Sequence, residues 1–276
     1  DRGKKDLWKY GYIPFDGAEN ETVSKNLEYY LAAWSVAKVA GHLGHKEDSV
    51  RFYNLSQGYK KIFDERVLCF RAKDKAGNFR TLDGFSPNHH TSDYTEGTPW
   101  QYLWLVPHDV NGLIEMLGGK EKAEARLDSL FLASSQLNAD ANPDISGLIG
   151  QYAHGNEPSH HTIYIYNYLG KPEKAQKRIN EVFETMYTDK PDGVCGNEDV
   201  GQMSAWYVMA AMGLYQVEPC GGVYQLSAPL AREVSFNVAA DKTFTIRTKG
   251  KGRLVRSWKL NGKRLNRTWI THEEIM

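Results

Sequence analysis

The chain has 276 residues, of which 34 are Lys or Arg and 34 are Asp or Glu, so its formal net charge at pH 7 is zero. This balance argues against a polybasic surface for nucleic acid or for an anionic membrane, because both kinds of binding need many Lys and Arg side chains near phosphate groups. The length allows one large domain or two ordinary ones. No apolar run approaches the roughly 20 residues that cross a bilayer, and we recognise no secretory signal.

Two details of composition narrow the class of protein. Aromatic residues make up 12% of the chain, with 16 Tyr and 7 Trp, and many stand beside Gly, Asn, Asp or His. Such rings either pack in the core or line a polar cleft, where they stack on sugar faces. The three cysteines, Cys69, Cys195 and Cys220, have the spacing of neither a disulfide framework nor a zinc cluster.

The first two thirds of the chain are predicted to be helical. Apolar residues recur at helical spacing over residues 22–43 and 47–67, and a polar, irregular stretch at 69–94 has the length of a functional loop. Further helices, most of them ended by Gly or opened by Pro, are predicted over residues 98–117, 120–137, 159–169, 172–186 and 201–212. Helices that alternate between short turns and long polar loops indicate helical hairpins whose long loops gather on one face.

The last part of the chain changes its period. Residues 223–227, 233–238 and 243–248 alternate like half-buried strands, and Asn261-Gly262 predicts a hairpin turn. The sequence therefore predicts a mainly α domain over residues 1–218 and a β region over residues 219–276. We expect the β region to be truncated.

Carboxylates stand at three junctions where a loop leads into a helix. Glu96 lies in DYTEGTPWQY, Glu157 in HGNEPSHH, and Glu198 and Asp199 in GNEDVGQMSAWY. One interpretation is helix capping, which typically stabilises a helix by ~0.3–1 kcal/mol. The other is hydrolysis of an acetal, in which one carboxyl group protonates the leaving oxygen and a second activates water. A third carboxylate beside carbonyl and Asn oxygens has the donor chemistry that a hard cation such as calcium prefers.

Other chemistries find less support in the sequence. His154, His160 and His161 lack the spacing of a zinc site, and no Cys or His pair with ligand spacing accompanies them. The pair His89–His90 lies in an irregular loop and is interpreted as solvated, with a sugar contact as the alternative. The sequence contains no GxSxG, no P-loop and no GxGxxG after a strand, so nothing favours a nucleophile elbow, an NTPase or a dinucleotide site.

Around these junctions the sequence resembles glycoside hydrolase family 92, the calcium-dependent, exo-acting α-mannosidases found mainly in bacteria. The resemblance rests on four long segments in order, GYIPFDGAENETVSKNLEYYLAAW, DYTEGTPWQYLWLVPHDVNGLIEMLGG, PDISGLIGQYAHGNEPSHHTIYIYNY and PDGVCGNEDVGQMSAWYVMAAMGLY. It implies an N-terminal β-sandwich followed by an (α/α)6 barrel. This chain would hold the later part of that barrel, a helical-hairpin toroid, and its trailing strands.

The resemblance also implies roles for individual residues. Glu96 would be the general acid and Asp199 the general base of an inverting hydrolysis. Calcium would be held by the backbone carbonyl of Asn156 and the carboxylate of Glu157, with Asp199 close to the ion. Contacts with the sugar, or support for such contacts, would come from a further set: Trp100, Gln101, His154, His160 and Glu198.

The resemblance further implies a mannose-containing glycan, an N-glycan or a mannan, as the substrate, with α-1,2 as the expected linkage. It implies a bacterial protein that is secreted or periplasmic. The competing interpretation is a non-catalytic carbohydrate-binding helical module, whose acidic junctions serve as caps and contacts. Because the sandwich and the earlier barrel helices would be missing, we expect the isolated chain to expose apolar faces and to be unstable or inactive.

Overall fold

The computed structural model describes residues 3–250 and 252–276. The chain forms two compact units, Asp1–Ser159 and His160–Met276, and each is described by itself. No helix among the described residues combines the length and the apolar character that a membrane span requires.

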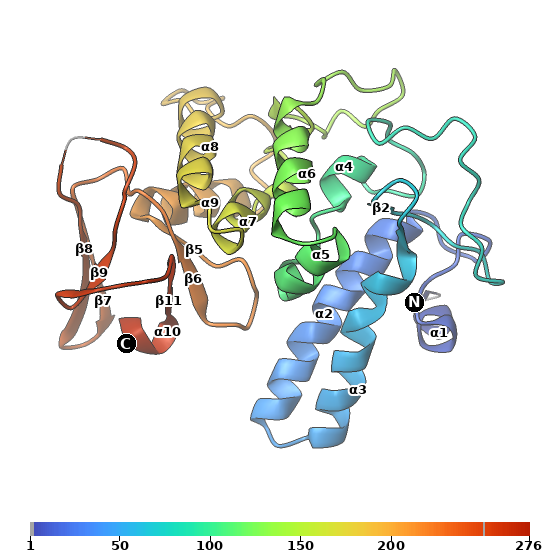
Figure 1. Cartoon of the computed structure of the whole chain (residues 1–276), viewed down its shortest axis with the longest axis horizontal. Coiled ribbons are helices and arrows are strands. Elements are labelled where there is room, and N and C mark those ends of the chain that lie inside the picture. Colours follow the sequence, from blue (N-terminus) through green and yellow to red (C-terminus); the bar gives the residue numbers. More distant parts are fainter. Residues whose placement is uncertain (1–2, 251) are drawn as a thin grey trace. The chain divides into compact units, whose positions relative to one another are not determined.

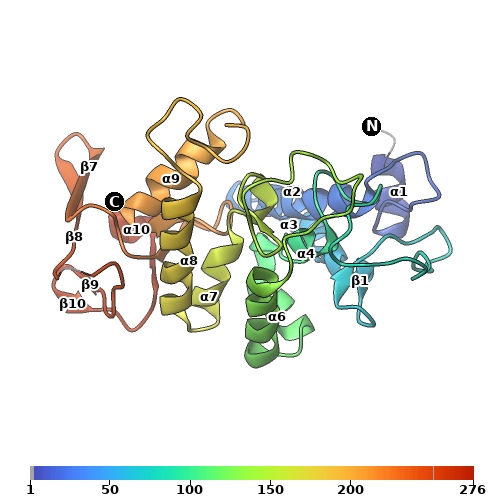
Figure 2. The ribbon, with the colours of Figure 1, turned by 90° about the horizontal axis from the view of Figure 1, so that it is seen from above.

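The first unit is rich in helices (Figures 1 and 2), and it contains two very short strand pairs. Its helices are α1 (Gly3–Tyr10), α2 (Thr22–His42), α3 (Lys46–Ser56), α4 (Pro99–Tyr102), α5 (Val110–Met116) and α6 (Lys120–Leu132), with 3₁₀ turns at Gln57–Ile62, Pro107–Asp109 and Glu157–Ser159. Its antiparallel strand pairs are β1 (Phe63–Asp64) with β2 (Cys69–Phe70), and β3 (Leu148–Ile149) with β4 (Tyr152–Ala153).

The predicted helix at 22–43 is confirmed as α2, which buries Val23, Leu27 and Tyr30 completely. The helix predicted over 47–67 is wrong in its second half, because α3 ends at Ser56 and the chain tightens into a 3₁₀ turn. Gly58 lets this turn pack against α2: a Cβ added there would lie 2.3 Å from the Tyr30 ring, so only glycine permits this approach.

The single helix predicted over 98–117 is also wrong. Thr98 and Gln101 form a capping box at the start of α4, but the helix ends at Tyr102. Pro107 then opens a 3₁₀ turn, and Val106 before it has a φ of −130°. Proline lacks the N–H that a helix interior needs and disfavours helical conformation in the residue that precedes it, so the helix is interrupted until α5 begins.

A buried ion pair anchors the long loop at 69–94. Arg71 and Asp64 lie 2.7 Å apart, with 4% and 2% of their side chains exposed, and Arg71 also donates to the backbone carbonyls of Arg80 and Thr81 at 2.7 Å. The loop is thereby fixed along its course toward α4, which follows the first of the three acidic junctions.

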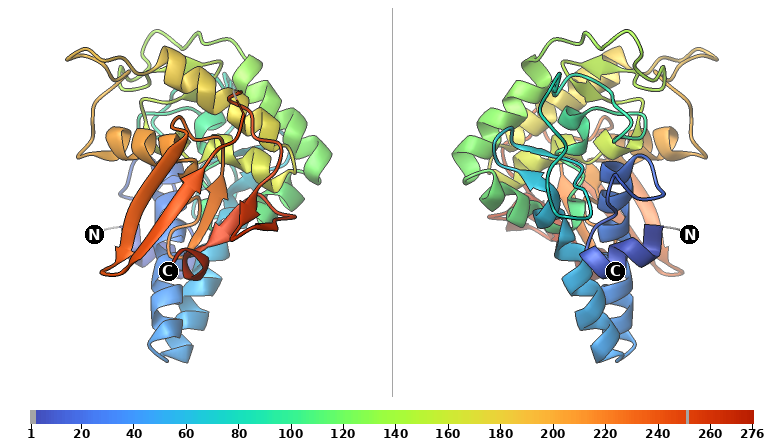
Figure 3. Two further views of the ribbon diagram at one scale, coloured as in Figure 1. Left: turned by 90° about the vertical axis from the view of Figure 1, so that its left-hand side faces the viewer. Right: turned by 90° about the vertical axis from the view of Figure 1, so that its right-hand side faces the viewer.

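The second unit combines helices with short strands (Figure 3). Its helices are α7 (Ile165–Tyr168), α8 (Pro172–Thr185), α9 (Gln202–Met212) and α10 (His272–Ile275), with a 3₁₀ turn at Thr162–Tyr164. Its strands are β5 (Leu214–Tyr215), β6 (Val223–Leu226), β7 (Glu233–Ala239), β8 (Lys242–Arg247), β9 (Lys259–Leu260), β10 (Lys263–Arg264) and β11 (Trp269–Thr271).

The strands form one three-stranded sheet, in the order β11-β6-β5, and two hairpins, β7-β8 and β9-β10. The predicted strands and the turn at Asn261-Gly262 are confirmed, and both turn residues have positive φ, as the hairpin chemistry requires. The buried core of this part comprises Leu214, Leu226, Ile270 and Ile275.

The change from helices to strands falls between Met212 and Leu214, near the predicted boundary at 218. The two compact units, however, divide between Ser159 and His160, so α8 and α9 share a unit with the strands. The division into domains 1–218 and 219–276 stays a prediction.

Candidate functional site

Glu96 occupies a strained backbone position in the loop before α4. Its φ of 44° is left-handed, a conformation that costs a residue with a Cβ roughly 1–2 kcal/mol. Two side chains hold the carbonyls of this turn: Asn156 Nδ2 donates to the Glu96 carbonyl across 2.5 Å, and His90 Nδ1 lies 2.9 Å from the Gly97 carbonyl oxygen. Strain that is held in place by long-range contacts is typical of functional loops.

The residue before Glu96 is fixed as well. The backbone N–H of Thr95 donates to Ser24 Oγ at 2.8 Å, and the Thr95 carbonyl accepts a hydrogen bond from the Tyr102 hydroxyl at 2.7 Å. Gly97 has no room for a side chain, because an added Cβ would lie 2.5 Å from the Tyr102 ring. The Glu96 side chain therefore projects from a backbone whose conformation is set on both sides.

Trp100 and Gln101 support this junction from inside α4. The Gln101 side chain accepts from the Thr98 N–H at 2.6 Å and donates to the Gln151 carbonyl at 2.9 Å. Trp100 donates to Asn88 Oδ1 at 2.8 Å, and the Arg126 guanidinium lies 3.8 Å from its ring centroid. Both side chains are almost fully buried, so the structure gives them supporting contacts, and the expected contact with a sugar stays a prediction.

The β3-β4 hairpin leads directly into the second acidic junction, which contains Asn156 and Glu157. His154 is completely buried, and its Nδ1 lies 2.8 Å from the Tyr152 hydroxyl. Gly155 passes so close to Ser146 that a Cβ would meet Ser146 Oγ at 2.0 Å. Asn156 follows, and its amide reaches Glu96 as described above. The structure therefore brings Glu96 and Asn156, 60 residues apart in the chain, into direct contact.

Glu28 is a residue that the sequence analysis missed. It lies on α2 and keeps contact with solvent, yet burial by the surrounding protein raises the pKa of its carboxyl, and the negative charge of Glu157 raises it further. The protein around Glu28 thus disfavours the charged form of its carboxyl, and Glu157 is close enough to add to this effect. A signal was present in the sequence, since Glu28 is the single acid in the segment NLEYYLAAW.

Calcium fits the donors near Glu157 by their chemistry. Among residues 3–250 and 252–276, no three or more His, Cys, Asp or Glu side chains are grouped to hold a metal ion. The available donors are oxygens, namely the carboxylates of Glu157 and Glu28 and the backbone carbonyl of Asn156, and calcium also takes carbonyls and waters as ligands. A divalent cation would relieve the repulsion between the two carboxylates.

The third acidic junction lies in the second unit and has a strained backbone of its own. Asp199, Val200 and Gly201 have φ values of 53°, 57° and 95° in succession. Positive φ in a β-branched residue such as Val200 is a genuine outlier, and Val200 is fully exposed. Glu96 and Asp199, the predicted acid and base, thus both have left-handed backbones.

The structure separates the neighbours Glu198 and Asp199. Both carboxylate oxygens of Glu198 accept backbone N–H groups at the start of α9, from Gly201 and, at 3.0 Å, from Ser204. A hydrogen bond with the Ser204 side chain, followed by those with the backbone N–H groups of Ser204 and Gly201, lowers the pKa of the Glu198 carboxyl. Glu198 is therefore a cap, while Asp199 is exposed and its carboxylate makes no hydrogen bond to the described residues. A substrate contact by Glu198 stays a prediction.

His160, which opens the second unit, is buried against α9. Its Nδ1 lies 3.0 Å from Gln202 Nε2, and its backbone carbonyl accepts a hydrogen bond from Trp206 Nε1 at 3.0 Å. These contacts tie the third junction to the segment that follows Glu157 in the chain. The predicted sugar contacts of His154 and His160 are not tested by these bonds and stay predictions.

Comparisons with known proteins agree on one family. The profile described as "Glycosyl hydrolase family 92 catalytic domain" matches residues 1–276. A secreted glycosidase of Arthroderma benhamiae, uncharacterised in its activity, is 32% identical over 310 residues, which cover 99% of this chain and 37% of the relative.

Two solved structures from Bacteroides thetaiotaomicron are similar along nearly the whole chain. A family GH92 α-mannosidase, in complex with mannoimidazole, superposes with a TM-score of 0.91 and is 36% identical. The match covers 98% of this chain and 37% of the α-mannosidase chain. A family GH92 inverting mannosidase superposes with a TM-score of 0.87 and is 34% identical. The match covers 99% of this chain and 38% of the mannosidase chain. The chain therefore spans a little over a third of the length of these relatives, and it belongs to the catalytic domain of glycoside hydrolase family 92.

Proposed function

We propose that this chain carries the catalytic loops of an exo-acting α-mannosidase, which removes terminal α-linked mannose from glycans with inversion. Family membership supports the reaction class, since the two solved relatives are named as an α-mannosidase and an inverting mannosidase. The observation that carries the proposal is the turn at Glu96, held in a left-handed conformation by Asn156 from the Glu157 loop.

In the proposed reaction, Glu96 and Asp199 each move one proton. The Glu96 carboxyl gives its proton to the glycosidic oxygen as the bond from that oxygen to the anomeric carbon breaks. The Asp199 carboxylate takes a proton from the water that attacks the anomeric carbon on the opposite face of the sugar. The α-mannoside thus yields β-mannose and a free hydroxyl on the leaving sugar.

We also propose that calcium binds at this site, through the backbone carbonyl of Asn156 and the carboxylate of Glu157, with Asp199 close by and Glu28 as a further carboxylate. When bound, the ion supplies positive charge that can hold sugar hydroxyls. The chain's own residues do the rest: Asn156 and His90 orient the Glu96 turn, and the Glu198 cap holds the start of α9 beside Asp199.

The wider expectations belong to the same proposal. The helices of residues 1–218 would be the later part of an (α/α)6 barrel, residues 219–276 its trailing β region, and an N-terminal β-sandwich would complete the parent protein. The linkage would be α-1,2 in an N-glycan or a mannan. A secreted or periplasmic protein agrees with the fungal relative, which is named as secreted, and a bacterial source remains the expectation from the sequence.

Two variants in the complete enzyme test the assigned roles. Glu96→Gln should abolish turnover of an α-mannobiose but retain much of it on dinitrophenyl α-mannoside, whose leaving group needs no proton. Asp199→Asn should lose turnover on both substrates, because the water is no longer activated. Glu47→Gln, at an exposed position on α3, is the matched control and should keep wild-type activity. Equal losses on both substrates for Glu96→Gln would refute its role as the acid, and glycan binding without any product would favour the non-catalytic module.

A further inference from the structure

The zero net charge of the chain is the sum of two opposite regional charges that cancel. Residues 219–276 hold 11 Lys and Arg against 4 Asp and Glu, whereas residues 1–218 hold 23 against 30. Between residues 242 and 272 there are ten basic residues and no acidic one. A division of charge on this scale points to an anionic partner for the basic region.

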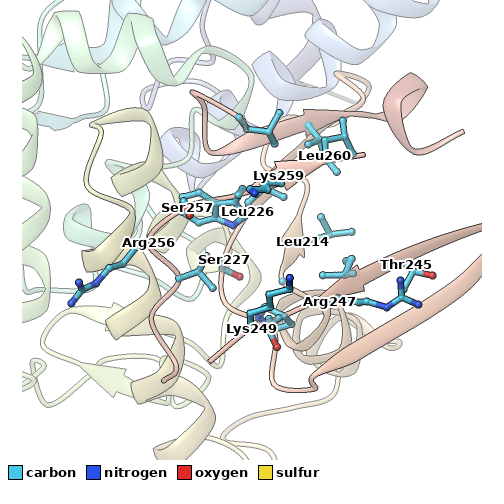
Figure 4. Close-up of a pocket in the computed structure, with 18 of the residues that line it drawn as sticks. Leu214, Leu226, Ser227, Thr245, Arg247, Lys249, Arg256, Ser257, Lys259 and Leu260 are labelled. Carbon is cyan, nitrogen blue, oxygen red and sulfur yellow. The ribbon is translucent and has the colours of Figure 1, made fainter. Parts of the chain in front are cut away.

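Part of this basic region surrounds a cavity in the second unit. The cavity has a volume of about 830 Å³ and is lined by β8, by the segment that leads into β9, and by residues of β5 and β6 (Figure 4). Four cationic side chains, and no Asp or Glu, are among the lining residues: Arg247, Lys249, Arg256 and Lys259. The charged side chains of the lining are therefore all positive, and they stand among apolar and neutral polar residues.

Most of this positive charge is not neutralised within the protein. Arg247 pairs with Glu233, their Nε and Oε2 atoms lying 2.8 Å apart. For Lys249, Arg256 and Lys259, by contrast, the described part of the chain offers no ion pair. In Figure 4, Lys249 lies at the end of β8, Lys259 on β9, and Arg256 extends outward at the rim. Three unpaired cations thus stand on different segments around one space.

The remaining lining has groups that suit a sugar. Trp258 packs against the core of this unit and also lines the cavity, where part of its half-buried indole can contact a sugar ring. Its buried Nε1 has no hydrogen-bond partner among the described residues. Ser257 adds a hydroxyl, and Asn261 adds an amide. Side chains of these types exchange hydrogen bonds with the hydroxyls of a saccharide.

We propose that this cavity binds an anionic polysaccharide, a sugar chain that bears sulfate, carboxylate or phosphate groups. Lys249, Lys259 and Arg256 would pair with the acidic groups, and Trp258 would pack against a sugar ring. The proposal needs neither Glu96 nor Asp199, so it stands or falls independently of the proposed hydrolysis. A single indole in a concave space, in place of a row of exposed aromatic side chains, favours a sugar chain over single-stranded nucleic acid.

The test compares charged and neutral forms of one sugar polymer. The purified complete enzyme is titrated with dextran sulfate and with neutral dextran, at low and at physiological ionic strength. Titration with polygalacturonate tests whether carboxylate groups also bind. The basic-site variant combines Lys249→Gln, Arg256→Gln and Lys259→Gln. The control variant removes the same charge from exposed lysines on helices, through Lys46→Gln, Lys120→Gln and Lys177→Gln. Circular dichroism melting confirms that both variants are folded.

We expect binding to dextran sulfate that weakens with salt, with much weaker binding to dextran. The basic-site variant should lose roughly tenfold in affinity, since each lost ion pair contributes a few-fold, and the control should stay within about twofold of wild type. The conservative variant Trp258→Phe, which keeps a ring, should bind nearly as wild type. Equal affinity of the two triple variants would overturn the proposal. So would binding of RNA or of phosphatidylserine vesicles as tight as that of dextran sulfate.

Discussion

Replacing Asn156 by Ala should lower kcat of the complete enzyme about tenfold, because it removes the amide that donates to the Glu96 carbonyl across 2.5 Å. The left-handed backbone of Glu96 costs roughly 1–2 kcal/mol, and a hydrogen bond contributes about 0.5–1.5 kcal/mol. Losing this bond therefore removes a stabilisation comparable to the strain, and about 1.4 kcal/mol corresponds to a factor of ten. KM should change little, since the variant keeps the backbone carbonyl of residue 156 and the carboxylate of Glu157.

The assay is release of mannose from an α-mannobiose, with kcat and KM determined separately. Asn54→Ala is the matched control, because Asn54 lies on α3, is exposed, and makes no side-chain hydrogen bond to the described residues. A folded Asn156→Ala enzyme whose kcat lies within about twofold of wild type would refute the view that this amide orients Glu96. A rise in KM with kcat unchanged would also refute it.

Further predictions concern stability, pH and metal. Arg71→Met should destabilise the fold by about 3 kcal/mol in chemical denaturation, because it leaves the buried Asp64 carboxylate with only part of its pairing, whereas Arg253→Met should cost less than about 1 kcal/mol, since its ion pair is exposed. Hydrogen bonds, first from Arg66 and then from Arg71, lower the pKa of Asp64 from 3.8 to about 2. The stability that this group contributes is therefore fully present above pH 3.8 and is lost as the pH falls toward 2, so denaturation midpoints should fall in that window and less so in Asp64→Asn. Excess chelator should abolish turnover and added calcium restore it; full activity without calcium would remove the metal from the account. The isolated chain should not hydrolyse α-mannobiose, and measurable turnover would contradict that expectation.

The sequence predicted best those elements whose signals are local. α2 carries its own helical period, α8 begins at Pro172, and the β9-β10 turn is formed by Asn261-Gly262. Hydrophobic period and turn chemistry are properties of neighbouring residues, so no knowledge of the rest of the fold was needed. The strands β6, β7 and β8 were predicted for the same reason.

Tertiary contacts decided where local signals failed. The helix that begins at Lys46 ends at Ser56, and the turn that follows packs closely against another helix, where Gly58 meets Tyr30. Pro107 was visible in the sequence, but the prediction continued the helix through residues 103–106. In the structure the helix is interrupted there. Local propensity is a weak guide where packing or a proline opposes it.

The candidate site, too, was predicted only where its signals are local in the sequence. The motifs singled out Glu96 and Asp199, whose roles stay predictions. They did not show the left-handed backbone of either residue, nor the hydrogen bond that Glu96 accepts from Asn156, far along the chain. The same motifs did not show that the carboxylate of Glu198 caps α9. Glu28 was overlooked because its partner, Glu157, lies 129 residues away. The basic region was hidden because the charge was summed over the whole chain.

The stereochemistry of the first product tests the central claim most directly. Proton NMR can follow the complete enzyme on an α-mannoside and record the anomer of mannose before mutarotation mixes the two forms. A general acid at Glu96 and a water-activating base at Asp199 predict β-mannose first, with α-mannose appearing later. If α-mannose appeared first, the reaction would retain configuration, and the roles assigned to Glu96 and Asp199 would be contradicted.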